Sequence, residues 1–223
     1  MQHLGSRLAD ILIGVATAFA IVAITLPFFL NPVWVSFEQG RADAAGWTGF
    51  TEDDLRAATD SILVDLVLGP PDFDVEVGGE PVLNEREGEH MRDVRSVFAL
   101  FLGVTVALTI AAIVVVARRG AAGRRRSWAA VRGGAFGLIV TFIAVGGIAL
   151  VAFDTLFEVF HQLFFAGGSY TFDPATERLV QLFPFQFWQE TAIAVGVVSI
   201  VIAIVVAVVA DGRAKPADGV AVA

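Results

Sequence analysis

The sequence predicts an all-α membrane protein, a four-transmembrane-helix bundle with a helical extracytoplasmic cap, and three observations support this. Of its 223 residues, 56% are hydrophobic and only 17% are charged, whereas a soluble domain carries about 25% charged residues. Four uncharged apolar stretches are long enough to cross a hydrocarbon core of about 30 Å as helices. Lysine and arginine are also distributed unevenly among the segments that connect these stretches.

The expected transmembrane helices cover residues 11–30, 97–117, 133–152 and 191–210 of a single integral membrane domain, residues 1–223. The first ends near Pro27 and Pro32, because proline stops a helix. The alternative for this stretch is a cleaved signal peptide, since Arg7 precedes it. Its apolar run is longer than a typical signal-peptide core, and no small-residue cleavage site is followed by a soluble domain.

The basic residues predict an N-in/C-in orientation. Segment 118–132 contains six arginines and no acidic residue, so we place it in the cytoplasm with the N-terminus and the tail, residues 211–223. The cytoplasmic parts then have nine basic and three acidic residues, a net charge of +6. The extracytoplasmic segments 31–96 and 153–190 have six basic and twenty acidic residues, a net charge of −14. We therefore expect a multi-pass protein of the bacterial cytoplasmic membrane that contacts membrane lipids.

Two properties of the whole chain exclude function classes. Its net charge of −8 argues against an electrostatic nucleic-acid partner. It has no cysteine, which excludes disulfide frameworks, thiolate metal sites and cysteine nucleophiles.

The first extracytoplasmic segment is expected to contain a short amphipathic helix. Thr51 is followed by three acidic residues, a pattern typical of a helix N-terminus, and apolar residues at helical spacing continue to about Leu68. Apolar and polar residues alternate from residue 73 up to Gly78-Gly79, and apolar residues follow at 82 and 83, which indicates a small hairpin.

The second extracytoplasmic segment is expected to continue the third span as a helix. Residues 153–165 lack a helix breaker and place four phenylalanines on one face, beside a stripe formed by Asp154, Glu158 and His161. Asp173-Pro174 then indicates a short helix that reaches about Phe183. Phe185, Phe187 and Trp188 are expected to anchor the start of the fourth span.

The candidate chemistry centres on two extracytoplasmic histidines, His90 and His161. If the second and third spans are antiparallel neighbours, both histidines reach the same end of the bundle. Asp93 follows His90 by three residues and Glu158 precedes His161 by three, so each imidazole has a carboxylate that can orient it or raise its pKa. Arg92 and Arg95 are nearby cations for a polar or anionic headgroup.

Three other interpretations stay open from the residues alone. The histidines and carboxylates can be ordinary solvated surface, or belong to a non-enzymatic scaffold or assembly protein in which the two histidines do not face each other. They can also form a His/carboxylate metallo-hydrolase site at the outer membrane face, with His90, His161 and Asp93, Glu158 or Asp154 as ligands. The isolated His-x-x-Asp and Glu-x-x-His spacings are weak metal-site signals, so we expect no metal.

Three stretches resemble a family of bacterial four-span integral membrane proteins that includes Lit, the lipoprotein intramolecular transacylase. They read EHMRDVRSVF at residues 89–98, FDTLFEVFHQLFF at 153–165 and TFDPATERLVQLFPFQFW at 171–188. The resemblance implies a membrane acyltransferase that shifts the sn-2 acyl chain of a diacylglyceryl lipoprotein to the α-amino group of its N-terminal cysteine.

The resemblance also implies which residues carry the reaction. His90 and His161 match the family's histidines and form the expected catalytic pair, one as general base and the other as acid or oxyanion stabiliser. The expected supporting or substrate-binding residues are Asp93, Arg95, Asp154, Glu158, Arg92 and Tyr170. An ester-to-amine transfer within one substrate needs no enzyme nucleophile or cofactor, so we expect none.

Overall fold

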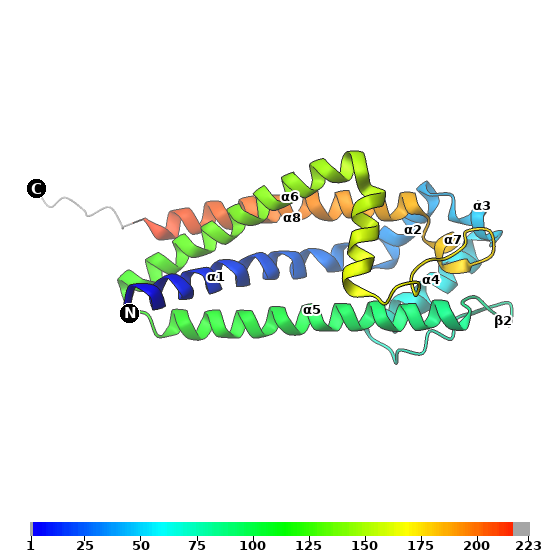
Figure 1. Ribbon diagram of the computed structural model, residues 1–223, viewed down its shortest axis with the longest axis horizontal. Helices are drawn as coiled ribbons and strands as arrows, with labels where there is room; N and C mark the ends of the chain where they lie inside the picture. The colour runs from blue at the N-terminus through cyan, green and yellow to red at the C-terminus, as the bar shows by residue number, and fades with distance from the viewer. Residues whose placement is uncertain (1, 216–223) are drawn as a thin grey trace, which may run out of the picture. The chain divides into compact units, whose positions relative to one another are not determined.

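The computed structural model describes residues 2–215 and confirms an all-helical fold with four long apolar helices (Figure 1). These are α1 (Gln2–Thr25), α5 (Glu85–Ala117), α6 (Ala121–Phe164) and α8 (Phe185–Ala214), and each contains a stretch long and apolar enough to cross a bilayer. The end of the predicted tail, residues 216–223 with Asp218, lies outside the described residues.

The remaining elements are short. They are the 3-10 turn η1 (Leu26–Phe28), α2 (Pro32–Arg41), α3 (Ala44–Thr48), α4 (Glu52–Val67), β1 (Glu76–Val77), β2 (Glu80–Pro81) and α7 (Arg178–Leu182). The described residues divide into two compact units, one of residues 2–25, 102–146 and 196–215, the other of residues 26–101 and 147–195.

The first unit packs through small and aliphatic side chains. Its buried core contains Ile21 of α1, Ala135 and Leu138 of α6, and Ala203 of α8. Asp10 of α1 pairs with Arg119 and Arg126. The basic segment that we expected to be a loop from 118 to 132 is already helical from Ala121. Alanine and arginine are strong helix formers, which accounts for the longer helix.

Two glycines allow α1 and α6 to approach each other closely in this unit. A Cβ atom added to Gly134 would stand 2.6 Å from the Cα atom of Gly14, well inside van der Waals contact. Close helix crossings in membranes depend on such small residues.

We expect Gly134→Ala to destabilise the protein by about 1–3 kcal/mol, because the added methyl forces the two backbones apart. Gly137→Ala is the matched control, since a Cβ at Gly137 of the same helix meets no atom within 4 Å. Thermal unfolding of both variants in one detergent measures the difference. Equal melting temperatures for the two variants would contradict this account.

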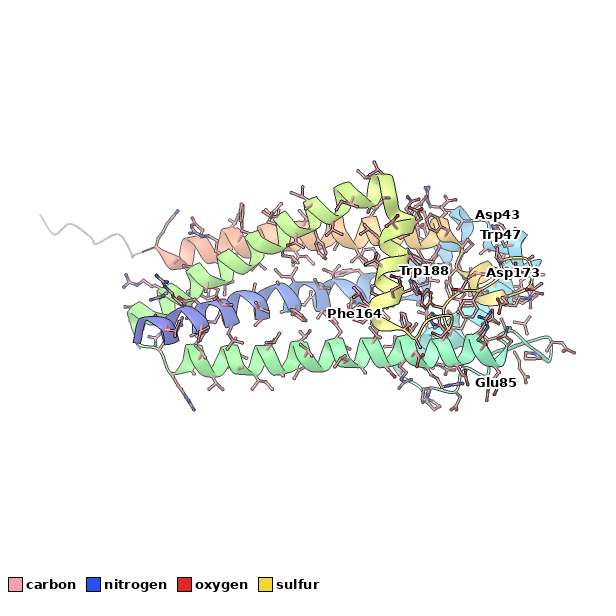
Figure 2. All side chains as sticks on the ribbon, viewed as in Figure 1. Asp43, Trp47, Glu85, Phe164, Asp173 and Trp188 are labelled. Atoms are coloured by element: carbon pink, nitrogen blue, oxygen red, sulfur yellow. The ribbon has the colours of Figure 1, made fainter. Side chains whose placement is uncertain are left out.

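The second unit contains the short helices and a separate apolar core. This core includes Ile62 of α4 and Leu182 of α7, both fully buried. Helix α3 packs against α7, and Figure 2 shows Trp47 of α3 in the same region as Asp173, which precedes α7. The Arg178 guanidinium donates to the Thr48 carbonyl oxygen at 2.7 Å, which joins α7 to the end of α3.

Several local predictions for this unit are confirmed. Helix α4 begins after Thr51, whose hydroxyl accepts the backbone N–H of Asp54 at 3.2 Å. The small hairpin is present, with β1 and β2 antiparallel around Gly78-Gly79. Both glycines have positive φ, a conformation that a tight hairpin turn requires.

Two local predictions need correction. Helix α7 begins at Arg178 and not at Pro174, because Asp173 caps only a turn: its backbone oxygen accepts the N–H groups of Thr176 and Glu177. The helix that continues the third span is present to Phe164 but is interrupted at Ala152, which has φ −148° and ψ 45°.

Candidate active site

The rings of His90 and His161 face each other although seventy-one positions separate them in the sequence. Their centroids are 6.0 Å apart with an interplanar angle of 22°, a stacked arrangement. His90 lies on the second turn of α5, before the apolar stretch that starts at about residue 97, and His161 lies on α6 after the interruption at Ala152. Both side chains are buried, with 6% and 8% of their surface exposed.

Aromatic rings enclose the two histidines. Phe165 contacts both, with its centroid 4.8 Å from that of His90 and 5.4 Å from that of His161. Four further rings each pack on one of the two: Phe172 on His90, and Phe157, Phe160 and Tyr170 on His161. The enclosure replaces water around both imidazoles with apolar surface.

The hydrogen bond of His161 determines which of its nitrogens can act as a base. Its Nδ1 atom lies 2.7 Å from the carbonyl oxygen of Phe157, one turn earlier on α6. A carbonyl oxygen only accepts, so Nδ1 of His161 carries a proton and donates. In the neutral ring Nε2 of His161 therefore keeps its lone pair.

His90 is held in its neutral form. Burial among apolar groups lowers the pKa of His90 to about 4, with a further lowering from His161 and an opposing attraction from Asp93. Among residues 2–215 its Nδ1 atom is buried and has no hydrogen-bond partner. Such an orphaned polar atom inside an apolar enclosure is uncommon and points to a group that meets a ligand.

We expect the protein to lose part of its stability as the pH falls from about 6.5 to about 4. In this range the unfolded chain protonates His90 while the folded chain keeps it neutral, so acid favours unfolding. His90→Gln should show a smaller loss over the same window. Thermal unfolding of both proteins across this range measures the effect, and identical pH dependence would contradict the lowered pKa.

The predicted supporting residues divide into two groups. Tyr170 and Glu158 lie beside His161: the Tyr170 hydroxyl donates to Glu158 at 2.9 Å while its ring packs on the imidazole, and this hydrogen bond raises the pKa of Tyr170. Asp93 and Asp154 are exposed, and neither hydrogen-bonds to a histidine within the described part of the chain.

Arg92 and Arg95 are engaged with backbone carbonyl groups. The Arg92 guanidinium donates to the carbonyl oxygen of Asp72 at 3.2 Å. That of Arg95 donates to the carbonyl oxygens of Asp65 and Gly69 at the C-terminal end of α4. Both arginines thus fasten the segment after α4 to α5. Within residues 2–215 no group of three or more metal-ligating side chains occurs.

The structure adds one site-supporting residue that we did not predict, Glu87. The Glu87 carboxylate accepts the backbone N–H of Asn84 at 2.8 Å, and the Asn84 side chain accepts that of Glu87 at 3.0 Å, so the pair caps α5 just before His90. The second carboxylate oxygen of Glu87 accepts the backbone N–H of Leu179 in α7 at 2.6 Å. The Asn-x-x-Glu spacing was the available signal in the sequence.

The model of the family described as lipoprotein intramolecular transacylase Lit matches residues 11–188. Among solved structures, the chain is similar to the membrane-integral lipoprotein intramolecular transacylase Lit from Bacillus cereus, with a TM-score of 0.77 and 18% sequence identity over 96% of this chain and 97% of that one.

Two structures of the same Bacillus cereus protein, in which one histidine is replaced by arginine or by alanine, are also similar. Both have a TM-score of 0.72 and 17% identity over 95% of this chain, and over 93% and 94% of those chains. No curated protein matches the sequence significantly.

Proposed function

Because the chain belongs to the lipoprotein intramolecular transacylase family, whose members are membrane acyltransferases, we propose that His90 and His161 are its catalytic pair. The substrate in this proposal is a diacylglyceryl lipoprotein, whose sn-2 acyl chain moves to the α-amino group of its N-terminal cysteine. The observation that carries the proposal is the stacking of two buried histidine rings, 6.0 Å apart, inside an aromatic enclosure.

The reaction needs a base, because the attacking amine has a pKa of about 8 and is mostly protonated at neutral pH. We assign this role to His161, since its Nδ1–H···O bond to Phe157 leaves the Nε2 lone pair available. The protonated amine first releases one proton to the medium through Nε2 of His161. The free amine nitrogen then attacks the ester carbonyl carbon, and a second proton passes from the attacking nitrogen to Nε2 of His161.

His90 then acts on the oxygen atoms of the reacting ester. Its lowered pKa keeps it neutral, so it presents one N–H donor to the oxyanion without adding a second positive charge beside His161. When the tetrahedral intermediate collapses, the carbon–oxygen bond to glycerol breaks and the glyceryl oxygen takes the proton from His161. Both histidines return to their neutral forms, and no water, metal or cofactor takes part.

An exposed apolar surface beside His161 supports direct access from lipid. Val159, Phe160, Leu163 and Phe164 lie on one side of α6 and are each between 44% and 74% exposed. Phe160 also packs edge-on against His161, with the two ring centroids 5.4 Å apart, so this surface adjoins the aromatic enclosure. An acyl chain can therefore pass from the bilayer along this surface to the catalytic pair.

The proposed location is the extracytoplasmic side of the cell membrane. The support is the charge partition of the sequence, +6 in the segments assigned to the cytoplasm and −14 in those that carry the histidines. This arrangement suits a substrate whose lipid part stays in the outer leaflet while its peptide is outside.

The direct test uses purified protein in vesicles with a synthetic diacylglyceryl lipopeptide, analysed by tandem mass spectrometry. We expect the total mass to stay constant while the N-terminal cysteine fragment gains one acyl group. The same lipopeptide with an acetylated amine is the control and should not react. Release of free fatty acid would identify a hydrolase, and an unreacted substrate with folded protein would favour a scaffold. Either result would contradict the proposal.

A further inference from the structure

The segment between α6 and α7, residues 166–177, forms one wall of the aromatic enclosure. Its Tyr170 ring lies 5.0 Å from the His161 ring, and its Phe172 ring lies 5.4 Å from the His90 ring. The segment contains turns but no helix or strand. Its position over the histidines therefore depends on side-chain contacts from other elements.

Arg86 of α5 supplies four of these contacts. Its Nη1 atom donates to the carbonyl oxygen of Thr171 at 2.8 Å and to that of Gly168 at 3.4 Å. Its Nη2 atom donates to the Glu177 carboxylate in an ion pair. The guanidinium carbon also stands over the Phe172 ring, 4.6 Å from its centroid. One side chain thus holds the middle and the end of the segment.

The far end of the segment is itself ordered by Glu177. The Glu177 carboxylate accepts the backbone N–H of Asp173 at 2.6 Å as well as the Arg86 and Asn84 donors. Burial by itself raises the pKa of Glu177, but these hydrogen bonds together outweigh it and lower the pKa, so Glu177 remains ionised and paired at neutral pH.

Arg86 and His90 are four residues apart on α5 and lie one above the other on the same face. The anchor of the segment is therefore one helical turn from the imidazole that the segment covers. Arg86 touches neither histidine. The Phe172 ring packs between the Arg86 guanidinium on one side and the His90 imidazole on the other.

We propose that Arg86 is a positioning residue for the transacylation, holding the 166–177 segment over the histidine pair and acting on His90 through Phe172. The inference rests on the proposed function of His90. The chemistry favours arginine at this position, because its planar fork can bond two carbonyl oxygens and a carboxylate at once while stacking on an aromatic ring. A lysine keeps only the ion pair.

The test measures His90 directly. Histidine-selective NMR titration of the full-length protein in detergent micelles should show the pKa of His90 rising from about 4 toward 6.5 in Arg86→Ala, because water reaches the imidazole once the segment loosens. In the same variant the transacylation rate constant should fall by about tenfold or more, with a smaller change in KM. For Arg86→Lys, the pKa of His90 and the rate constant should both lie between the values of Arg86→Ala and those of the wild type.

Two further variants make the test specific. Arg41→Ala is the matched control, since Arg41 also pairs with a glutamate and is similarly exposed, with 50% of its side chain exposed against 45% for Arg86. It should leave the pKa of His90 and the rate unchanged. Phe172→Ala should raise the pKa of His90 as Arg86→Ala does, and the double variant should show little additional change.

The outcomes separate the two proposals. An unchanged pKa of His90 in both Arg86 variants, or additive effects of the Arg86 and Phe172 substitutions, would overturn the positioning role. If Arg86→Ala does not fold, the titration of Arg86→Lys decides the question. Failure of the proposed function instead appears as full transacylation by His90→Ala, whatever the titration of His90 in the Arg86 variants shows.

Discussion

Replacing His161 by alanine should slow transacylation by about 10²–10⁴-fold, the range expected for loss of a general base. Nε2 of His161 takes the proton of the attacking amine in the proposed reaction, and the phenylalanine rings that pack on His161 have no basic nitrogen to replace it. The measurement is the rate at which the N-acyl product forms, with reconstituted protein at equal amounts of folded enzyme.

The substitution His161→Asn tests the catalytic role of His161 separately from its role in folding. Its side-chain amide can still donate to the Phe157 carbonyl oxygen as Nδ1 of His161 does, but it has no basic nitrogen. We therefore expect His161→Asn to fold like the wild type and to be as inactive as His161→Ala. Thr155→Ala, an exposed position on the same helix, is the control and should retain activity. Full activity in His161→Ala or in His90→Ala would exclude the catalytic pair.

Glu87→Ala should destabilise the protein by about 2–4 kcal/mol. The Glu87 side chain is buried, and its carboxylate accepts backbone N–H groups at the start of both α5 and α7. Loss of one helix cap costs about 1 kcal/mol, and each buried N–H left without a partner costs about 1–3 kcal/mol. Because α5 begins just before His90, activity should fall as well.

Glu89→Ala is the matched control for this prediction. Glu89 has the same charge and lies on the same turn of α5, but it is exposed. Urea or thermal unfolding of the two variants in one detergent should show a large loss for Glu87→Ala and almost none for Glu89→Ala. Equal stability would mean that the two helix caps contribute nothing measurable.

The parts of the fold that local sequence controls were predictable. Hydropathy identifies the spans, because a helix must satisfy its own backbone groups in lipid. Thr51 and the acidic residues after it mark the start of α4, and Gly78-Gly79 marks the hairpin turn. Helix α2 was missed, although Asn31-Pro32 signals its start: Asn31 accepts the N–H groups of Val33 and Trp34.

The features that depend on distant contacts were not predictable. Nothing local marks Ala152 as the point where α6 is interrupted, since alanine favours helix. The sequence around Arg95 indicates a free cation, but its actual partners are carbonyl groups of Asp65 and Gly69, about thirty residues earlier. The same applies to the candidate site. The two histidines can be identified from the sequence. The contacts of Arg86 cannot, because its partners Thr171 and Glu177 lie 85 and 91 positions later in the chain.

The central claim is that the acyl chain moves within one substrate molecule at the histidine pair. The most direct measurement mixes two lipopeptides of different peptide mass, only one of which has a deuterated sn-2 acyl chain, and follows the label by tandem mass spectrometry. We predict that the deuterated chain appears on the N-terminal amine of its own peptide and on no other. Labelled chain on the second peptide, or labelled free fatty acid, would contradict the account.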